Sequence, residues 1–120
     1  MSASSVIDLA TRQLAAYNRS DLDAFCACFH PEVCVLTAEG AVRSEGIAAF
    51  RATYGTMFTQ HRDVRGELVA RVHAGEHVVE HERWSRVDRT TNVRSEGEVL
   101  VRYTEQDGLI RWVQFFRPSH

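Results

Sequence analysis

The sequence predicts an α+β fold in which a curved, cone-shaped antiparallel sheet wraps around N-terminal helices and encloses one apolar pocket. Amphipathic helical patterns recur before residue 60, four long segments of strand character follow, and glycine-containing turns or polar loops separate the strands. The chain has 120 residues, of which 44% are hydrophobic and 25% are charged. This size and composition are those of one ordinary globular domain, which we place over residues 1–120.

Three helices are expected. Residues 6–18 place apolar side chains on one stripe at helical spacing, which is typical of an amphipathic helix. A short second helix over residues 22–29 ends before Pro31, and a third begins at Ser44 and carries large apolar side chains at helical intervals.

The remaining segments are predicted strands. In order, they are residues 33–37, 41–43, 66–74, 77–88, 97–105 and 109–116. A two-residue turn at Gly75-Glu76 pairs Val72 with Val79 and Ala70 with His81. The strands from residue 66 onward therefore form an antiparallel meander.

This register predicts which side chains enter the pocket. Leu68, Ala70, Val72 and Val79 share one face of the hairpin, and we expect this apolar face to be the buried one. His81 and Arg83 then point into the pocket as well. Glu80, Glu82 and Trp84 would lie on the opposite, outer face of the sheet.

The charge composition excludes several kinds of function. All 14 basic residues are arginine, so lysine Schiff-base chemistry is excluded, and a proton-transfer step would need another residue type. The net charge is −2 with no basic run, which predicts no nucleic-acid partner. No apolar run is long enough for a membrane span, and the first residues lack the pattern of a secretory signal, so we expect a cytoplasmic protein without a membrane partner.

The cysteines and histidines do not form a metal-binding pattern. Cys26, Cys28 and Cys34 lie in apolar segments and are expected to be small buried side chains. His73 and His77 straddle the hairpin turn before His81, so these three cannot close around one ion. The sequence predicts neither a metal nor a cofactor.

Three stretches carry a resemblance to a known superfamily: residues 14–25, 46–54 and 103–110. They resemble the nuclear transport factor 2-like superfamily, and within it the SnoaL-like and steroid Δ-isomerase-like group of small bacterial proteins. The resemblance covers essentially the whole chain and implies the cone fold. That fold hosts isomerases, dehydratases, epoxide hydrolases, polyketide cyclases and non-catalytic modules.

The resemblance also allows a comparison with the steroid isomerase pattern. That pattern implies a tyrosine on the first helix, an acid on a late strand and an aspartate base on the first strand. In this chain these positions fall on Gln13, Val101 and Thr37, respectively, and none keeps the required group. Only a supporting tyrosine matches, at Tyr54. The sequence therefore does not predict steroid isomerase activity.

His81, Arg83 and Tyr54 are the candidate catalytic residues. A neutral His81 in an apolar pocket could act as a base, Arg83 could hold an anionic oxygen, and Tyr54 could donate a hydrogen bond. The alternative is that His81 and Arg83 only form hydrogen bonds with each other, with backbone carbonyls or with a buried water. Further polar or aromatic pocket residues are expected to be Gln13, Thr37, Tyr103, Trp112 and Gln114.

Two functional hypotheses follow. The first is a protein that binds an apolar small molecule and acts as a lyase or isomerase on an apolar carbonyl or polyketide-like compound. The second is a non-catalytic ligand-binding or dimerisation module of the same fold. Since Glu82 and Trp84 are expected on the outer sheet face, where an aromatic anchor suits an interface, a homodimer through that face is predicted.

Overall fold

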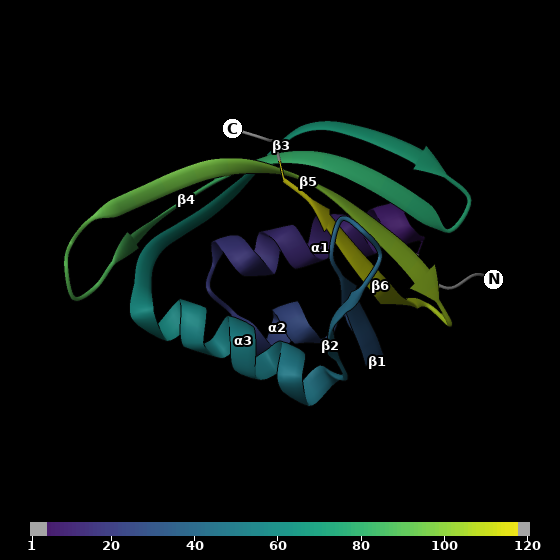
Figure 1. Ribbon diagram of the computed structural model, residues 1–120, viewed down its shortest axis with the longest axis horizontal. Helices are drawn as coiled ribbons and strands as arrows, with labels where there is room; N and C mark the ends of the chain where they lie inside the picture. Colours follow the sequence, from purple (N-terminus) through teal and green to yellow (C-terminus); the bar gives the residue numbers. More distant parts are fainter. Residues whose placement is uncertain (1–4, 118–120) are drawn as a thin grey trace.

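The computed structural model describes residues 5–117, which form three helices and one six-stranded sheet. The elements in chain order are α1 (Val6–Asn18), α2 (Leu22–Cys26), β1 (Phe29–Leu36), β2 (Val42–Glu45), α3 (Ile47–Gln60), β3 (His61–Ala74), β4 (His77–Asp88), β5 (Arg94–Gln106) and β6 (Leu109–Phe116). The strand order is β2-β1-β6-β5-β4-β3, and every neighbouring pair is antiparallel except β1 with β6. The long strands arch over α1, with α2 and α3 farther from the sheet (Figure 1). The predicted α+β class is confirmed.

The helix boundaries differ from the prediction at two points. The second helix ends at Cys26, and β1 already begins at Phe29, so Pro31 lies inside a strand instead of closing the helix. Ser44 belongs to β2, and α3 begins only after Gly46. Gly46 has φ 90°, a left-handed conformation that glycine adopts without steric cost, which allows the chain to turn sharply from strand into helix.

Helix α1 is held against β3 by Asn18 and Gly66. The Asn18 side-chain amide donates to the Gly66 carbonyl over 3.0 Å, and its oxygen accepts from the Gly66 amide over 2.6 Å. A β-carbon at Gly66 would lie 2.8 Å from Leu14 Cδ1, so the missing side chain lets the helix approach closely. These contacts fix which turn of α1 faces the sheet.

An aromatic cluster around Phe25 fills the space between α2, α3 and β1. The Phe25 ring stacks on Phe50 with centroids 5.7 Å apart and lies 4.7 Å from Tyr54 and 5.0 Å from Phe29. The same apolar core includes Cys26 and Cys28. These two thiols and Cys34 are free and buried, which confirms their predicted role as small buried side chains.

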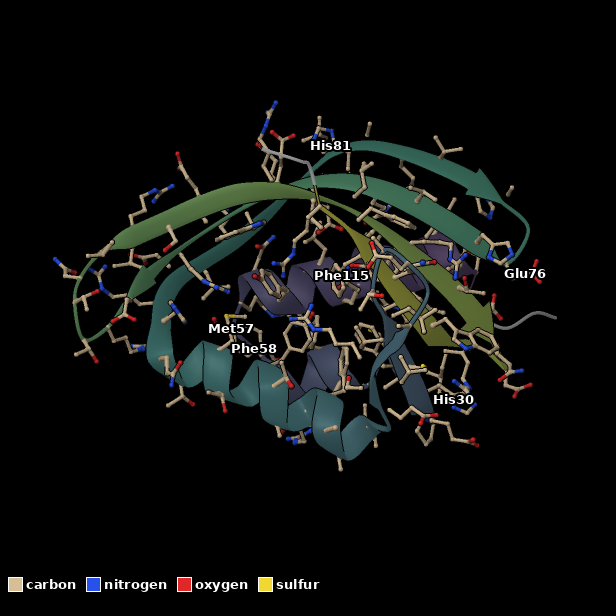
Figure 2. All side chains as sticks on the ribbon, viewed as in Figure 1. His30, Met57, Phe58, Glu76, His81 and Phe115 are labelled. Atoms are coloured by element: carbon tan, nitrogen blue, oxygen red, sulfur yellow. The ribbon has the colours of Figure 1, made fainter. Side chains whose placement is uncertain are left out.

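The β3–β4 register agrees with the prediction near the turn, but the predicted inner face is wrong. Val72 pairs with Val79 and Ala70 with His81, as expected. However, Val72 is 71% exposed, whereas Val78 and Glu80, which point the other way, are 0% exposed. Figure 2 shows His81 on the convex side of the sheet, while Phe58 and Phe115 lie between the sheet and the helices. The alternation of side chains along a strand shows which residues share a face. It does not show which of the two faces the helices cover.

Two β-bulges change the face of further residues. The β3–β4 register shifts between Leu68 and Ala70, so Leu68 pairs with Glu82 and lies on the inner face, apart from Ala70. A second shift in β5–β6 places Ile110 opposite Glu105 but Trp112 opposite Thr104. Ile110 therefore points inward and Trp112 outward, so the prediction that Trp112 lines the pocket is wrong.

Candidate functional site

A row of charged and aromatic side chains lies along the inner face of β4. It consists of Glu80, Glu82, Trp84 and Arg86, which alternate with outward-facing residues along one uninterrupted strand. Glu80 is completely buried, whereas the other three are partly exposed, so the row runs from the closed interior toward solvent. The expectation that Glu80, Glu82 and Trp84 lie on the outer face is wrong, because they occupy the side that the helices cover.

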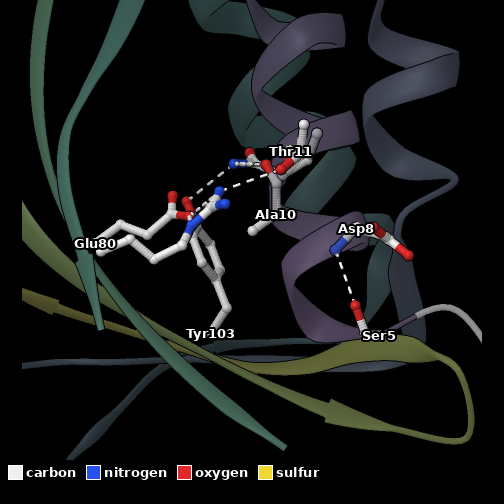
Figure 3. Close-up of polar contacts among 8 residues, drawn as sticks. Ser5, Asp8, Ala10, Thr11, Glu80 and Tyr103 are labelled. Carbon is white, nitrogen blue, oxygen red and sulfur yellow. Dashed lines mark hydrogen bonds and ion pairs between the residues drawn. The ribbon is translucent and has the colours of Figure 1, made fainter. Parts of the chain in front are cut away.

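Glu80 is compensated by an arginine on the neighbouring strand. Arg71 lies directly opposite it in the β3–β4 register. The Arg71 Nη2 and Nε atoms lie 2.6 and 2.7 Å from Glu80 Oε2, and Arg71 also donates to Thr11 Oγ1 on α1 over 3.2 Å (Figure 3). A buried carboxylate is tolerated when such charged hydrogen bonds replace its water.

The surroundings of Glu82 favour its protonated, neutral form. Its pKa is raised to about 8, first by burial and then by the hydrogen bond and the negative charge of Glu80. The hydrogen bond from Tyr103 and the positive charge of Arg71 oppose this rise. Glu80 Oε1 and Glu82 Oε2 are both buried without an N–H or hydroxyl donor, and a proton on Glu82 gives the pair the donor that it lacks.

Tyr103 and Gln13 connect this acid pair to α1. Gln13 Nε2 donates to the Ala10 carbonyl over 3.0 Å and to the Tyr103 hydroxyl over 3.3 Å, while Tyr103 donates to Glu82. In Figure 3 the Tyr103 hydroxyl lies beside the Glu80 carboxyl group, next to the α1 turn that contains Ala10. Burial, and then the charge of Glu82, raises the pKa of Tyr103, so its hydroxyl remains a donor. Two predicted pocket residues are thus brought together inside the fold.

Tyr54 and Tyr17 extend the site toward the open end of the row. Tyr54 packs on Phe25 and Phe50, and burial followed by the neighbouring Tyr17 and Glu82 raises its pKa. Burial also raises the pKa of Tyr17. For both hydroxyls the positive charge of Arg86 opposes this rise of the pKa. Tyr54 therefore lies on the inner side, as predicted.

The predicted combination of His81, Arg83 and Tyr54 is not assembled. The His81 ring lies on the outer face, where Nε2 is 2.6 Å from Glu98 Oε1, and its side chain is 28% exposed. Arg83 is exposed and lies between Glu67 and Glu98 in the register of the sheet. The expectation that His81 and Arg83 point into the interior with Tyr54 is wrong, for the reason given above for the whole hairpin.

Thr37 and Gln114 meet, but at the end of β1. Gln114 donates to the carbonyls of Thr37 and Ala38 over 3.0 and 3.4 Å, and Thr37 Oγ1 accepts from the Ala41 amide. Gln114 pairs with Arg102, between the inward-facing Val101 and Tyr103, and so belongs to the outer face. These two residues hold a turn together, and the prediction that Gln114 lines the inner face is wrong.

The residues that sequence reasoning missed are Arg71, Glu80, Glu82 and Arg86. One signal for them was available, because the predicted hairpin register already places Arg71 opposite Glu80. A charge pair directly across two strands can be stable on a buried face. Within residues 5–117 no group of three or more metal-ligating side chains comes together.

Two shallow hollows lie on the outside of the described structure. One, of about 320 Å³, lies over the outer face of β4 and β5 and is lined by His81, Glu98, Val99, Leu100, Phe116 and Arg117. The other, of about 310 Å³, lies between α1 and α2 and includes Arg12, Arg19 and Cys28. His81 therefore borders a hollow, but on the convex side of the sheet.

Residues 10–113 match the family of the SnoaL-like domain, and the chain belongs to this family. The fold is shared with an uncharacterised cystatin-fold protein of Novosphingobium aromaticivorans, at 22% identity and a TM-score of 0.83 over 95% of this chain and 99% of that one. A candidate polyketide cyclase from Pseudomonas putida has 18% identity and a TM-score of 0.79 over 96% and 92%.

A third similar structure is a protein of ketosteroid isomerase-like fold from Catenulispora acidiphila, in complex with trimethylamine. It has 14% identity and a TM-score of 0.76 over 91% of this chain and 84% of that one. No curated protein matches the sequence. Among the described helices, none is both long and apolar enough to cross a membrane. At these identities the structural neighbours establish the fold alone.

Proposed function

We propose that this protein binds an apolar carbonyl compound, such as a polyketide-like molecule, against the inner sheet face and acts on it as a lyase or isomerase. Glu82 would serve as the proton donor, with the carbonyl oxygen of the bound compound replacing Glu80 as the acceptor of its proton. The observation that carries the proposal is the carboxyl pair of Glu80 and Glu82, a combination that a purely structural core has no need to bury. Glu82 thus takes the proton-transfer role expected for His81.

The chemistry that this arrangement supports is enolisation of a carbonyl group. Solvent water takes the proton from the α-carbon while Glu82 passes its own proton to the carbonyl oxygen, and Glu82 then recovers a proton from water. A carboxylic acid that remains neutral at pH 7 can donate a hydrogen bond to a carbonyl oxygen and stabilise the negative charge that develops there. The Tyr103 hydroxyl lies beside Glu82, and Tyr54 is near it, so both can supply further donors. The fold itself is compatible with small ligands, since one structural neighbour holds trimethylamine.

A hydrogen-exchange assay tests the proposal. We expect the protein to accelerate the exchange of the α-protons of 2-tetralone, an apolar cyclic ketone, with deuterated water, as followed by proton NMR. Glu82→Gln keeps a hydrogen-bond donor of similar shape but cannot transfer a proton. It should slow the catalysed exchange by roughly 100-fold or more, the usual contribution of general acid–base catalysis.

Glu98→Gln is the matched control, because Glu98 lies on the outer face beside His81. This variant should exchange 2-tetralone at the rate of the unmodified protein. Equal rates for the Glu82→Gln variant and the unmodified protein would contradict the role of Glu82. Loss of exchange in the Glu98→Gln variant alone would instead place the chemistry on the outer face.

The second candidate function, a homodimer formed through the outer sheet face, is favoured by exposed apolar side chains on that face. Val72 is 71% and Leu100 44% exposed, and both lie on the face that carries His81. Glu82 and Trp84, expected at this interface, lie on the inner face and do not contribute. We expect sedimentation at micromolar concentration to show a dimer that Val72→Arg converts to a monomer, whereas a monomer of the unmodified protein would refute the interface.

A further inference from the structure

Arg86 is a cation on the inner face without a counterion. Its Nε atom is buried without a hydrogen-bond partner. No ion pair joins its guanidinium group to a carboxylate within residues 5–117. Asp88, the nearest carboxylate along the strand on the same face, accepts instead from the amides of Thr90 and Thr91. A buried donor without an acceptor is costly unless a ligand supplies one.

The other charged groups of the inner face do not neutralise Arg86. Arg71 and Glu80 form an ion pair with each other and contribute no net charge. The raised pKa of Glu82 favours its uncharged form. Arg86 is therefore a positive charge on the inner face that no carboxylate of the described residues pairs, which favours an anionic group on whatever binds beside it.

The surroundings of Arg86 are aromatic. Its guanidinium carbon lies 5.0 Å from the centre of the Trp84 ring, and Gly97 on β5 leaves room for that ring, since a β-carbon there would lie 2.8 Å from Trp84 Cζ2. Stacking on Trp84 holds the guanidinium group in place while leaving its edge free for an acceptor. Tyr17 lies beside the same part of the sheet, since a β-carbon at Gly66, the residue paired with Trp84, would lie 3.6 Å from its ring. Tyr54 shares the aromatic cluster of Phe25 with Tyr17.

We propose that the ligand of the inner face carries a carboxylate or another stable anionic oxygen, bound by Arg86, on an apolar or aromatic body that lies along Trp84 and the tyrosines. This inference rests on the proposed function, because it specifies the ligand class of the same site. An arginine edge matches a carboxylate with two parallel hydrogen bonds, and such pairs are strong where water is largely excluded. Neutral carbonyl compounds and cations would bind less tightly.

A pair of matched probes tests the inference. 2-Naphthoate and 2-naphthamide have the same aromatic body and differ in the charge of one group, and their binding can be followed by isothermal titration calorimetry at neutral pH. We expect 2-naphthoate to bind about tenfold or more tightly than 2-naphthamide. In the Arg86→Gln variant the two dissociation constants should become equal. Arg83→Gln, which removes an exposed arginine three residues away on the outer face, should keep the preference.

The outcomes separate this inference from the proposed function. If the unmodified protein binds 2-naphthamide as tightly as 2-naphthoate, the anionic ligand class is wrong while ligand binding to the inner face stands. A preference that survives in Arg86→Gln would also overturn the role of Arg86. Failure of both probes to bind at millimolar concentration, together with no exchange of 2-tetralone, would overturn the proposed function as well. The comparison in the unmodified protein is informative even if Arg86→Gln does not fold.

Discussion

Replacing Arg71 by methionine is expected to lower the free energy of unfolding by about 3–5 kcal/mol, the usual cost of removing one partner of a buried ion pair. Glu80 is completely buried and pairs with Arg71 through two short contacts. Without this arginine the carboxylate would lose its counterion in a place that water does not reach. Urea unfolding at neutral pH, followed by circular dichroism, measures the change.

Two further variants serve as controls for the stability loss expected in Arg71→Met. Arg71→Met combined with Glu80→Met replaces both charges by apolar groups and should recover most of the lost stability, because no charge is then left unpaired. Arg19→Met breaks an exposed ion pair with Asp21 and should cost less than about 1 kcal/mol. A loss for Arg71→Met as small as that for Arg19→Met would show that Glu80 is not buried as a charged group.

The second large effect is a dependence of stability on pH that comes from Glu82. Its pKa is about 8 in the folded protein, against an ordinary value of 4.5. Between these two values the folded state holds a proton that the unfolded state has released. The contribution of Glu82 to the free energy of unfolding should therefore be highest below the ordinary value, fall by up to about 1.4 kcal/mol per pH unit between the two, and level off above pH 8.

Glu82→Gln should remove this dependence. The neutral amide cannot ionise, so the stability of the variant should change much less than that of the unmodified protein as the pH rises toward 8. Glu98→Gln, on the outer face, should retain the decline. Urea titrations at a series of pH values measure the difference, and parallel curves for the unmodified protein and Glu82→Gln would exclude a raised pKa at Glu82.

Periodicity and turns were sufficient to predict the fold class, the first helix and the long meander. The hairpin turn at Gly75-Glu76 also gave the correct pairs near the turn. The face could not be assigned in the same way. Val72 and Val79 form the more apolar face of the hairpin and were assigned to the interior, whereas α1 covers the face with Glu80, whose charge Arg71 compensates. Apolar content alone does not identify the covered face when the interior contains a polar site.

The bulges explain the remaining errors on individual residues. A single extra residue reverses the alternation of inward and outward side chains. The parts of β3 before and after Val69 therefore follow opposite patterns, and so do the parts of β6 before and after Arg111. Simple alternation predicts that Trp112 points inward, and the extra residue turns it outward. Tyr54, Gln13 and Tyr103 were predicted correctly to lie inside, because two of them are on helices and the third follows the uninterrupted alternation of β5.

The central claim is that Glu82, on the inner sheet face, retains its proton at neutral pH. An NMR titration of the side-chain carboxyl carbons, with the Glu82 signal assigned from its loss in Glu82→Gln, tests this claim most directly. We expect one glutamate signal to titrate with a midpoint near pH 8. A midpoint for Glu82 near the ordinary glutamate value of 4.5 would contradict the account, because the site would then contain no acid to donate a proton at neutral pH.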